Sequence, residues 1–564
     1  MRSALDGSLH IALDEQVTVQ REAINALHEA CGIFTKRQVA QRVLDLVLWD
    51  ENLDCQNVRL LEPGCGNGTF VAEAARRLAR AARRNGLPVS YDNLRNSIVA
   101  LELWEPAVHE ARYATALALR EEGIDGRTAR RLADRWICHG DFVLSNLGAS
   151  FTHVIGNPPY VRWSKIPKPL RTLYERNLDR WIARGDLTLP FIWLGIQALR
   201  DDGRLAYLVS DRWLRTVYAE EVRNRLSDIA SVEAHIEMHN FDAFERHVDA
   251  YPAITVLRKS ISNGTPTKFL RVSNLLQLDR AARRLRTRRQ LGRHGHKPLS
   301  YPGAAVIGPR EAVDIVRELS TRLPSLTQVG CKIRCGIATG LAEAFIVSRT
   351  QTAVERSRLL PYIGSADLRP SGEIITSRFL INPWTVTGQL VDLDRYPRLA
   401  AHLRRFQEKL KTRACVTTHE EWFRTIDRIT PAHQSTPKLV IAGMGQAARV
   451  CLDQTGLVPG NALYMITSES WPLNALLRLF RAGAIDLFAE TLACRFSGNT
   501  KRYHGYLLRQ IRLPYWSDLD EQTKHMLCKQ PVNLDRCEIL GAVYGVAARS
   551  MRVILGRLPL WPVL

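Results

Sequence analysis

The tetrapeptide Asn157–Tyr160 (Asn-Pro-Pro-Tyr) constrains the fold of this chain more than any other stretch. It follows an apolar run, Phe151 to Ile155, that reads as a short buried strand ending at Gly156. Because two consecutive prolines fit neither a helix nor strand pairing, the chain must leave this strand in a stiff, extended conformation. In open α/β sheets, ligands bind at the carboxyl ends of strands, where this amide and aromatic ring would lie. A proline-rich turn without a ligand is the alternative.

A glycine-rich turn joins a strand predicted over residues 58–61 to a helix predicted over residues 69–84. The acidic and glycine residues of this turn are Glu62, Gly64, Gly66 and Gly68. Glycines at such a turn let a ligand approach the backbone closely. A carboxylate beside the turn would repel a pyrophosphate and attract cationic groups. The turn therefore favours S-adenosylmethionine, with its sulfonium and amino groups, over NAD, which is the alternative.

Two further predicted strands also end in polar residues suited to a nucleoside. Glu102 follows the strand over residues 98–101 and can bind both ribose hydroxyls, a surface carboxylate being the alternative. Asp141 and Phe142 follow the strand over residues 136–138 and can bind an adenine amino group and pack against its ring. Phe142 alone would be read as a core residue. The alternation of strands and helices predicts a doubly wound parallel sheet with a nucleoside pocket at these junctions.

Thr35 lies just before a helical pattern of apolar residues that begins at Val39. Its position suits the N-cap of that helix, and from the residues alone capping is the preferred reading.

The charge balance predicts a polyanionic partner. The chain of 564 residues has 78 Lys and Arg against 57 Asp and Glu, a net charge of +21. This excess is spread over a chain with 46% hydrophobic residues, so we expect nucleic acid rather than an anionic membrane. A basic protein without an anionic ligand is the alternative.

Other sequence signals disfavour membrane, secreted and metal-binding proteins. The N-terminal residues have no continuous apolar core typical of a signal peptide, and no window approaches the ~20 apolar residues of a membrane helix. We therefore expect a cytoplasmic protein without a membrane partner. The 11 cysteines are an odd number and form no Cys-x-x-Cys pair, so free thiols and no metal site are expected.

A change in composition divides the chain. Basic residues crowd one segment, namely Arg280, Arg283, Arg284, Arg286, Arg288, Arg289, Arg293 and Lys297. A solvated helix face or linker and a contact with DNA phosphates are equally good readings of this segment. We predict an N-terminal domain over residues 1–278, a linker over 279–300 and a second domain over 301–564. In the second domain, the basic helical run 398–413 and the basic-aromatic loop 495–506 suit nucleic-acid binding.

Together, the motifs resemble those of the TaqI-like adenine-N6 DNA methyltransferases, the gamma group with an Asn-Pro-Pro-Tyr motif, of restriction-modification or related defence systems. The motifs that carry this resemblance are Ile33–Lys36, Leu61–Gly68, Glu102, Gly140–Phe142 and Asn157–Tyr160. The resemblance covers nearly the whole chain and is strongest from Ile33 to Leu257. It implies an α/β protein with a Rossmann-like methyltransferase sheet dependent on S-adenosyl-L-methionine and a C-terminal mixed α+β DNA-recognition domain.

The resemblance also implies a role for each motif residue. The residues implied to bind the cofactor are Thr35, Glu62, Gly64, Gly66 and Gly68 for its methionine part, Glu102 for the ribose, and Asp141 and Phe142 for the adenine. Asn157 and Pro158 would bind the target amino group, and Tyr160 would stack on the flipped base. Phe244, in an Asp-Ala-Phe-Glu loop, matches the second stacking aromatic of the family. Lys36 departs from the proline that many members carry after the threonine.

These features predict a site-specific methyltransferase acting on N6 of an adenine flipped out of duplex DNA. The Asn157 amide oxygen and the Pro158 carbonyl would hold the amino hydrogens, so that catalysis relies on positioning and preorganised dipoles. An RNA or cytosine-N4 methyltransferase shares the tetrapeptide and is the first alternative, although the long basic C-terminal half favours DNA. A DNA-specificity subunit with a vestigial methyltransferase domain is the second. A separate restriction endonuclease or defence-system subunit is an open partner, and the recognition sequence is not readable.

Overall fold

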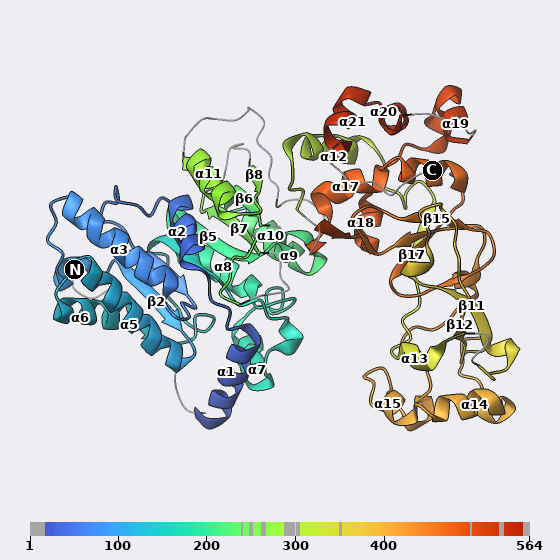
Figure 1. Ribbon diagram of the computed structural model, residues 1–564, viewed down its shortest axis with the longest axis horizontal. Coiled ribbons are helices and arrows are strands. Elements are labelled where there is room, and N and C mark those ends of the chain that lie inside the picture. Colours follow the sequence, from blue (N-terminus) through green and yellow to red (C-terminus); the bar gives the residue numbers. More distant parts are fainter. Residues whose placement is uncertain are drawn as a thin grey trace. The chain divides into compact units, whose positions relative to one another are not determined.

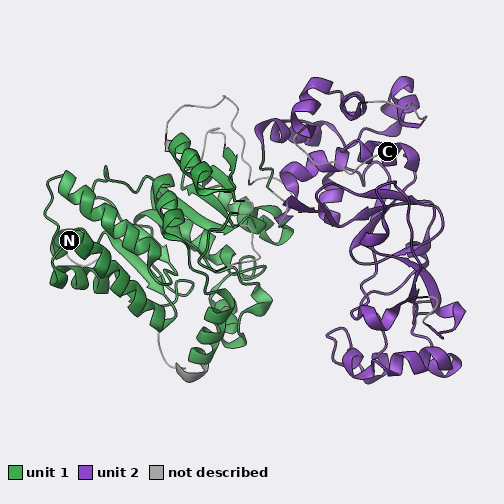
Figure 2. Cartoon of the chain, in the orientation of Figure 1, with its two compact units in different colours: residues 1–308, 496–498 green, residues 309–495, 499–564 purple. Residues whose placement is uncertain are grey.

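The chain forms two compact units in a computed structural model (Figure 2). Unit 1 comprises residues 1–308 and 496–498, and unit 2 comprises residues 309–495 and 499–564. The structure describes residues 17–238, 241–246, 252–260, 267–286, 299, 305–348, 352–496, 499–528 and 535–556. Within these ranges, no helix has the length and apolar character needed to span a bilayer.

Unit 1 is built on a sheet whose eight described strands follow the order β3-β2-β1-β4-β5-β7-β6-β8. Figure 1 labels β2, β5, β6, β7 and β8 of this sheet. The strands are β1 (Leu60–Pro63), β2 (Ile98–Glu102), β3 (Ile137–His139), β4 (Phe151–Gly156), β5 (Leu199–Ser210), β6 (Ser231–Glu237), β7 (Pro252–Arg258) and β8 (Lys268–Arg271). Strands β3 to β5 are all parallel, as the sequence predicted. Strand β7 is antiparallel to both β5 and β6, so the sheet is mixed rather than fully parallel. The apolar runs predicted the strands, but they carry no information on strand direction.

Helices cover both faces of this sheet, as expected for a doubly wound fold. One hydrophobic core contains residues of α2 (Arg37–Leu46), α3 (Thr69–Arg84), α5 (Glu105–Glu121), α6 (Gly126–Trp136) and α11 (Leu275–Arg286). A second core contains residues of α1 (Val17–Cys31), α7 (Lys168–Asn177), α8 (Thr188–Ala198) and α10 (Glu220–Ser227). The remaining short helices are α4 (Tyr91–Leu94) and α9 (Arg212–Arg215). Along β1, Leu60 belongs to the first core and Leu61 to the second, because successive strand residues face opposite sides.

Unit 2 combines helices with small sheets and lacks the regular alternation of unit 1. The described strands form sheets with the orders β10-β12-β11-β16, β15-β13-β17-β9 and β14-β19-β18. These strands are β9 (Cys331–Cys335), β10 (Ile346–Ser348), β11 (Leu359–Ile363), β12 (Arg378–Ile381), β13 (Lys438–Ala442), β14 (Met444–Gly445), β15 (Val450–Asp453), β16 (Val458–Pro459), β17 (Leu463–Ser468), β18 (Arg495–Phe496) and β19 (Thr500–Arg502). The helices are α12 (Arg310–Arg322), α13 (Ala342–Phe345), α14 (Pro397–Arg404), α15 (Gln407–Lys411), α16 (Leu473–Arg481), α17 (Ala484–Leu492), α18 (Gly505–Gln510), α19 (Glu521–Cys528), α20 (Arg536–Tyr544) and α21 (Ala548–Leu555). The predicted α/β fold class with a mixed α+β C-terminal part is confirmed.

In the segment 495–506, predicted as a loop suited to nucleic-acid binding, the described residues include strands β18 and β19, and Arg495, Lys501 and Tyr503 are buried while Arg502 is exposed. Lys501 is fully buried, with its Nζ 3.6 Å from Asp486 and 3.8 Å from Glu490. Arg495 pairs with Glu490 at 2.7 Å, and the Tyr503 hydroxyl donates to Asp486 at 2.7 Å. Arg495 and Lys501 therefore neutralise buried carboxylates of α17, so these two side chains are not a basic surface as the sequence suggested.

The basic segment predicted as a linker begins within helix α11. Arg280, Arg283 and Arg284 are exposed on this helix, and Arg42 of α2 pairs with Asp279 at 2.6 Å. Arg286 is the last residue of α11. The remaining predicted basic residues, Arg288, Arg289, Arg293 and Lys297, lie outside the described residues.

Candidate active site

A pocket lies where the parallel strands β1, β2, β3 and β4 end, at the edge of the sheet that the sequence predicted. It has about 760 Å³ of empty space, including open solvent at its mouth. The predicted site residues that line it are Gly64, Gly66, Glu102, Asp141, Phe142 and Asn157. The predicted site residues that do not line it are Thr35, Glu62, Gly68, Pro158, Tyr160 and Phe244.

The glycine turn after β1 is held in place by the end of β2. All three glycines have positive φ, which glycine adopts without strain. The Gly66 N–H donates to Glu102 Oε2 at 2.8 Å, and the Trp104 N–H donates to Glu102 Oε1 at 2.8 Å. A side chain at Gly68 would place its Cβ 2.7 Å from the Ala111 Cα. Gly68 thus allows α3 to pack against α5, whereas Gly64 and Gly66 border the pocket.

Three carboxyl groups bear on the pocket: Asp141 is buried and lines it, Glu102 is half-buried and lines it, and Glu62 is buried at the start of the glycine turn. Burial raises the pKa of Glu62 well above its usual value, and the nearby Glu102 raises it further. Burial likewise raises the pKa of Glu102 and of Asp141. The Glu62 carboxylate oxygen Oε2 is buried and has no hydrogen-bond partner. Such a concentration of desolvated carboxyl groups favours a cationic ligand, which would stabilise their charged forms.

Asp141 is oriented by donors from two directions. Its Oδ1 accepts the Val143 N–H at 2.8 Å, and its Oδ2 accepts the Tyr174 hydroxyl of α7 at 2.8 Å. Tyr174 is itself buried, so this hydrogen bond lies away from solvent. Next to Asp141, the Phe142 ring packs at 5.1 Å from the ring of Phe191.

Asn157 presents one end of its amide without a protein partner. Its Nδ2 donates to the Ile33 carbonyl at 2.9 Å. Because a carbonyl only accepts hydrogen bonds, the nitrogen must face Ile33, and this fixes the orientation of the amide. The opposite end, Oδ1, is buried and has no hydrogen-bond partner. Because a buried acceptor without a donor is costly, Asn157 Oδ1 is suited to accept a hydrogen bond from a ligand.

The two aromatic residues predicted to stack on a base lie together beside the pocket. The rings of Tyr160 and Phe244 are 6.2 Å apart in an edge-to-face arrangement. The Tyr160 hydroxyl donates to the Leu208 carbonyl of β5. The Phe244 side chain is only 4% exposed, so a base can reach its face only after its loop shifts.

Several pocket residues were not predicted from the sequence. They are His28 and Cys31 of α1, Phe34, Trp104, Tyr174 and Phe191. His28 stacks on Trp104, with ring centroids 3.7 Å apart, and Trp104 Nε1 donates to Asn25 at 2.9 Å. Helix α1 therefore closes one side of the pocket. The amphipathic pattern of this helix and the apolar run around Phe191 gave only the signal of ordinary core residues.

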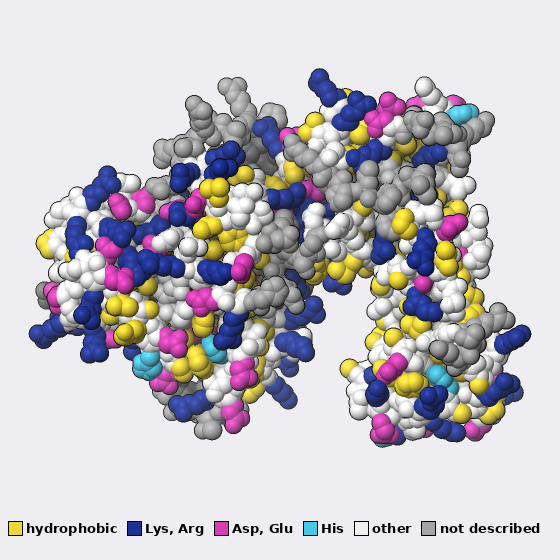
Figure 3. Space-filling view, viewed as in Figure 1, with side chains coloured by type: hydrophobic (Ala, Val, Ile, Leu, Met, Phe, Trp, Pro, Cys, Tyr) yellow, Lys and Arg dark blue, Asp and Glu magenta, His cyan; other side chains and the backbone are white. Residues whose placement is uncertain are grey.

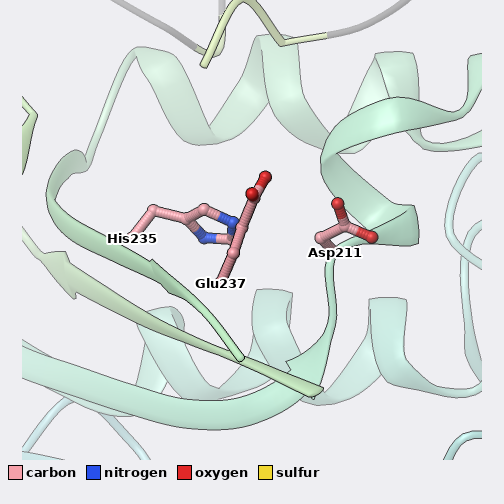
Figure 4. Close-up of side chains that lie close together, drawn as sticks. All are labelled: Asp211, His235 and Glu237. Carbon is pink, nitrogen blue, oxygen red and sulfur yellow. The ribbon is translucent and has the colours of Figure 1, made fainter. Parts of the chain in front are cut away.

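A separate cluster, Asp211, His235 and Glu237, brings together side chains of the types that bind metals (Figure 4). Arg215 joins the two carboxylates, with Nε 3.4 Å from Asp211 and Nη2 3.0 Å from Glu237. Arg271 also pairs with Glu237 at 2.7 Å. Because guanidinium groups already neutralise these carboxylates, we interpret the cluster as a buried ion-pair network.

Comparisons with known proteins identify the family of this chain. Residues 98–245 match the family described as Eco57I restriction-modification methylase. The chain is 33% identical over 526 residues to the type II methyltransferase M.PaeR7I of Pseudomonas aeruginosa, covering 90% of each chain. It is 32% identical over 520 residues to the type II methyltransferase M.XhoI of Xanthomonas vasicola, covering 90% of this chain and 95% of the relative. The structure of the type IIL restriction-modification enzyme MmeI in complex with DNA superposes with a TM-score of 0.58 over 95% of this chain and 74% of that one. At 13% identity, this last match indicates a shared fold.

Proposed function

Since the chain belongs to the Eco57I-type family of type II DNA methyltransferases of restriction-modification systems, we propose that its Asn157 holds the N6 amino group of an adenine for methylation. The enzyme is an adenine-specific DNA methyltransferase that depends on S-adenosyl-L-methionine. The observation that carries the assignment of Asn157 is its buried, unpartnered Oδ1 in the wall of the pocket.

The residues around the pocket fit the cofactor. When bound, S-adenosyl-L-methionine supplies an electrophilic methyl group on a cationic sulfonium. We assign its methionine part to Thr35 and the turn from Glu62 to Gly66. The buried atoms Glu62 Oε2 and Thr35 Oγ1 have no hydrogen-bond partner, so they can accept hydrogen bonds from the cofactor. Glu102 would bind the ribose, although its oxygens already accept two backbone N–H groups, and each oxygen has a further lone pair. Asp141 with Phe142 would bind the adenine ring.

The amino nitrogen of adenine is a poor nucleophile because its lone pair is delocalised into the ring. An acceptor at Asn157 Oδ1, together with the Pro158 carbonyl, would hold both amino hydrogens and let the nitrogen become more pyramidal. The nitrogen would then attack the methyl group in line, without a covalent enzyme intermediate. Rigid placement by Pro158 and by the Ile33 carbonyl supplies the preorganisation that this step needs.

We assign recognition of the DNA sequence to unit 2. Lys and Arg side chains are spread over the faces of both units in Figure 3, alongside acidic ones, as the net charge of +21 suggests. In unit 2, Arg404 at the end of α14 and the following Arg405 are exposed and suit contacts with phosphates. We extend the proposal to a bacterial cytoplasm and to a separate restriction endonuclease, because the family is described as belonging to restriction-modification systems.

The proposal is tested by giving the purified protein DNA and S-adenosyl-L-methionine with a labelled methyl group and identifying the methylated nucleoside. We expect N6-methyladenine, and sequencing DNA from cells with and without the protein would map its context. Asn157→Ala should lower the rate at least ~100-fold, the order of magnitude for one lost transition-state hydrogen bond, while DNA binding persists.

Asn177→Ala is the matched control. The Asn177 Nδ2 also donates to a backbone carbonyl, that of Leu173 at 2.8 Å, but its side chain is exposed and lies outside the pocket. This variant should methylate at the normal rate. Label on cytosine N4 or on RNA, or transfer by Asn157→Ala at the normal rate, would contradict the assignment.

A further inference from the structure

The short segment Ile33–Lys36 pairs with the loop that carries Phe244. Thr35 and Phe244 form an antiparallel bridge. On either side of it, the Lys36 N–H donates to the Ala243 carbonyl at 3.0 Å, and the Glu245 N–H donates to the Phe34 carbonyl at 3.0 Å. This pattern makes Thr35 and Phe244 a non-hydrogen-bonded pair, in which the two side chains lie close on the same side. The loops predicted to bind cofactor and base are thus directly joined.

The same segment also contacts two other parts of the site. The Ile33 carbonyl accepts Nδ2 of Asn157, as described above. The Phe34 ring lies against the glycine turn, since a Cβ at Gly66 would be 3.0 Å from it. Four consecutive residues therefore contact the cofactor turn, the amide for the target amino group and the loop of the stacking aromatic.

Lys36 makes two links to the Phe244 loop, one through its backbone and one through its side chain. Its backbone has φ −60° and ψ 136°, a conformation that proline adopts readily. A proline would therefore fit here, but it would lack the N–H that donates to Ala243. The Lys36 ammonium also pairs with Asp242, next to Ala243 on that loop. Because this ion pair is largely exposed, the backbone hydrogen bond is the stronger link.

We propose that Lys36 is a positioning residue that couples cofactor binding to capture of the flipped base. The proposal rests on the assigned roles of Thr35 and Phe244. The Phe244 ring is covered in this structure, so its loop must shift to receive a base. A cofactor bound at Thr35 fixes the conformation of the segment Ile33–Lys36. The hydrogen bond from the Lys36 N–H to Ala243 then restricts the Phe244 loop as well. By linkage, a captured base strengthens cofactor binding by the same factor.

The coupling is measured by binding alone, without turnover. The probe is a duplex containing the mapped site with 2-aminopurine, whose fluorescence rises on unstacking, in place of the target adenine. It is titrated with and without sinefungin, an analogue that cannot donate a methyl group. For the wild type, sinefungin should tighten duplex binding at least ~5-fold, the lower end of ordinary coupling, and raise the fluorescence.

Two substitutions at one position separate the two links. Lys36→Met removes only the ion pair and should retain most of the gain. Lys36→Pro also removes the N–H and should lower the sinefungin-dependent gain about fivefold, the factor expected for one hydrogen bond of ordinary net strength. Sinefungin affinity without DNA should stay unchanged in both. Arg80→Met is the control. It breaks the ion pair between Arg80 of α3 and Glu122, the residue that follows α5.

A wild-type protein that binds sinefungin and duplex independently would overturn the proposal, as would a Lys36→Pro protein with undiminished coupling. Either result leaves the methylation assay of the wild type untouched, so failure of this inference is distinguishable from failure of the proposed function.

Discussion

Replacing Glu62 by glutamine tests how much the burial of this carboxyl group lowers the free energy of unfolding. Glu62 is 1% exposed, its Oε2 has no hydrogen-bond partner, and Glu102 lies close enough to raise its pKa further. Glutamine keeps the shape and an acceptor for the backbone N–H of Val71, but it carries no charge. An unpaired buried charge costs more than an unpaired buried amide, so Glu62→Gln should stabilise the protein by about 1–3 kcal/mol at pH 8.

The stabilisation should depend on pH in a definite direction. Burial raises the pKa of Glu62 in the folded protein above its value in the unfolded chain. The folded protein therefore binds more protons than the unfolded chain between these two pKa values. The stability that this proton uptake contributes is complete below the unfolded pKa and is lost as the pH rises through the folded pKa. The gap between Glu62→Gln and wild type should thus be larger at pH 8 than at pH 5.

Calorimetry measures both consequences. The thermal midpoint of the transition for unit 1 should rise by about 2–6 °C in Glu62→Gln at pH 8. Affinity for S-adenosyl-L-methionine should fall about 10- to 100-fold, because a hydrogen bond to a charged group contributes about 1.5–3 kcal/mol. A midpoint gap that is equal at both pH values would refute the electrostatic reasoning. An unchanged affinity would refute the assignment of Glu62 to the cofactor.

Three further predictions concern orientation, packing and substrate. Tyr174→Phe removes the hydroxyl that donates to Asp141 and should weaken binding of the cofactor about fivefold, with no such loss for an analogue lacking the adenine amino group. Arg215→Met should destabilise unit 1 by about 3–5 kcal/mol in thermal unfolding, because the buried carboxylates of Asp211 and Glu237 lose the guanidinium group that pairs with both. If the cluster is an ion-pair network rather than a metal site, adding EDTA to the wild type should not change the thermal midpoint. DNA affinity should fall steeply between 50 and 200 mM salt, as expected for counterion release (about 10³-fold or more for six phosphate contacts), and a flat response would contradict a role for the basic surface.

The strands that form the pocket were predictable because each is a short apolar run ended by glycine or a carboxylate. Leu60 and Leu61 are both buried, as expected for a strand covered on both faces. Strand direction was not predictable, since the composition of β7 would suit either orientation. In unit 2, the sequence around Lys501 reads as a basic surface loop, and only the fold brings it against Asp486. Local sequence cannot show a partner supplied by another element.

For the site, the sequence predicted which residue types gather but not how close each lies to the pocket. Gly64 and Gly68 belong to one motif, yet Gly68 packs against Ala111 and only Gly64 lines the pocket. Tyr174 was missed because a tyrosine on an amphipathic helix is ordinarily a core residue. The roles of the predicted site residues stay predictions until the substitutions above are measured.

The bond between Asn157 and Pro158 also bears on how the enzyme ages. Asparagine commonly deamidates when the backbone nitrogen of the next residue attacks the side-chain amide and forms a cyclic imide. Proline has no N–H and its nitrogen is already fully substituted, so this route is closed at Asn157. The same residue that stiffens the end of β4 thus protects the adjacent amide from slow conversion to aspartate. Slow loss of activity during storage should therefore not come from imide formation at Asn157.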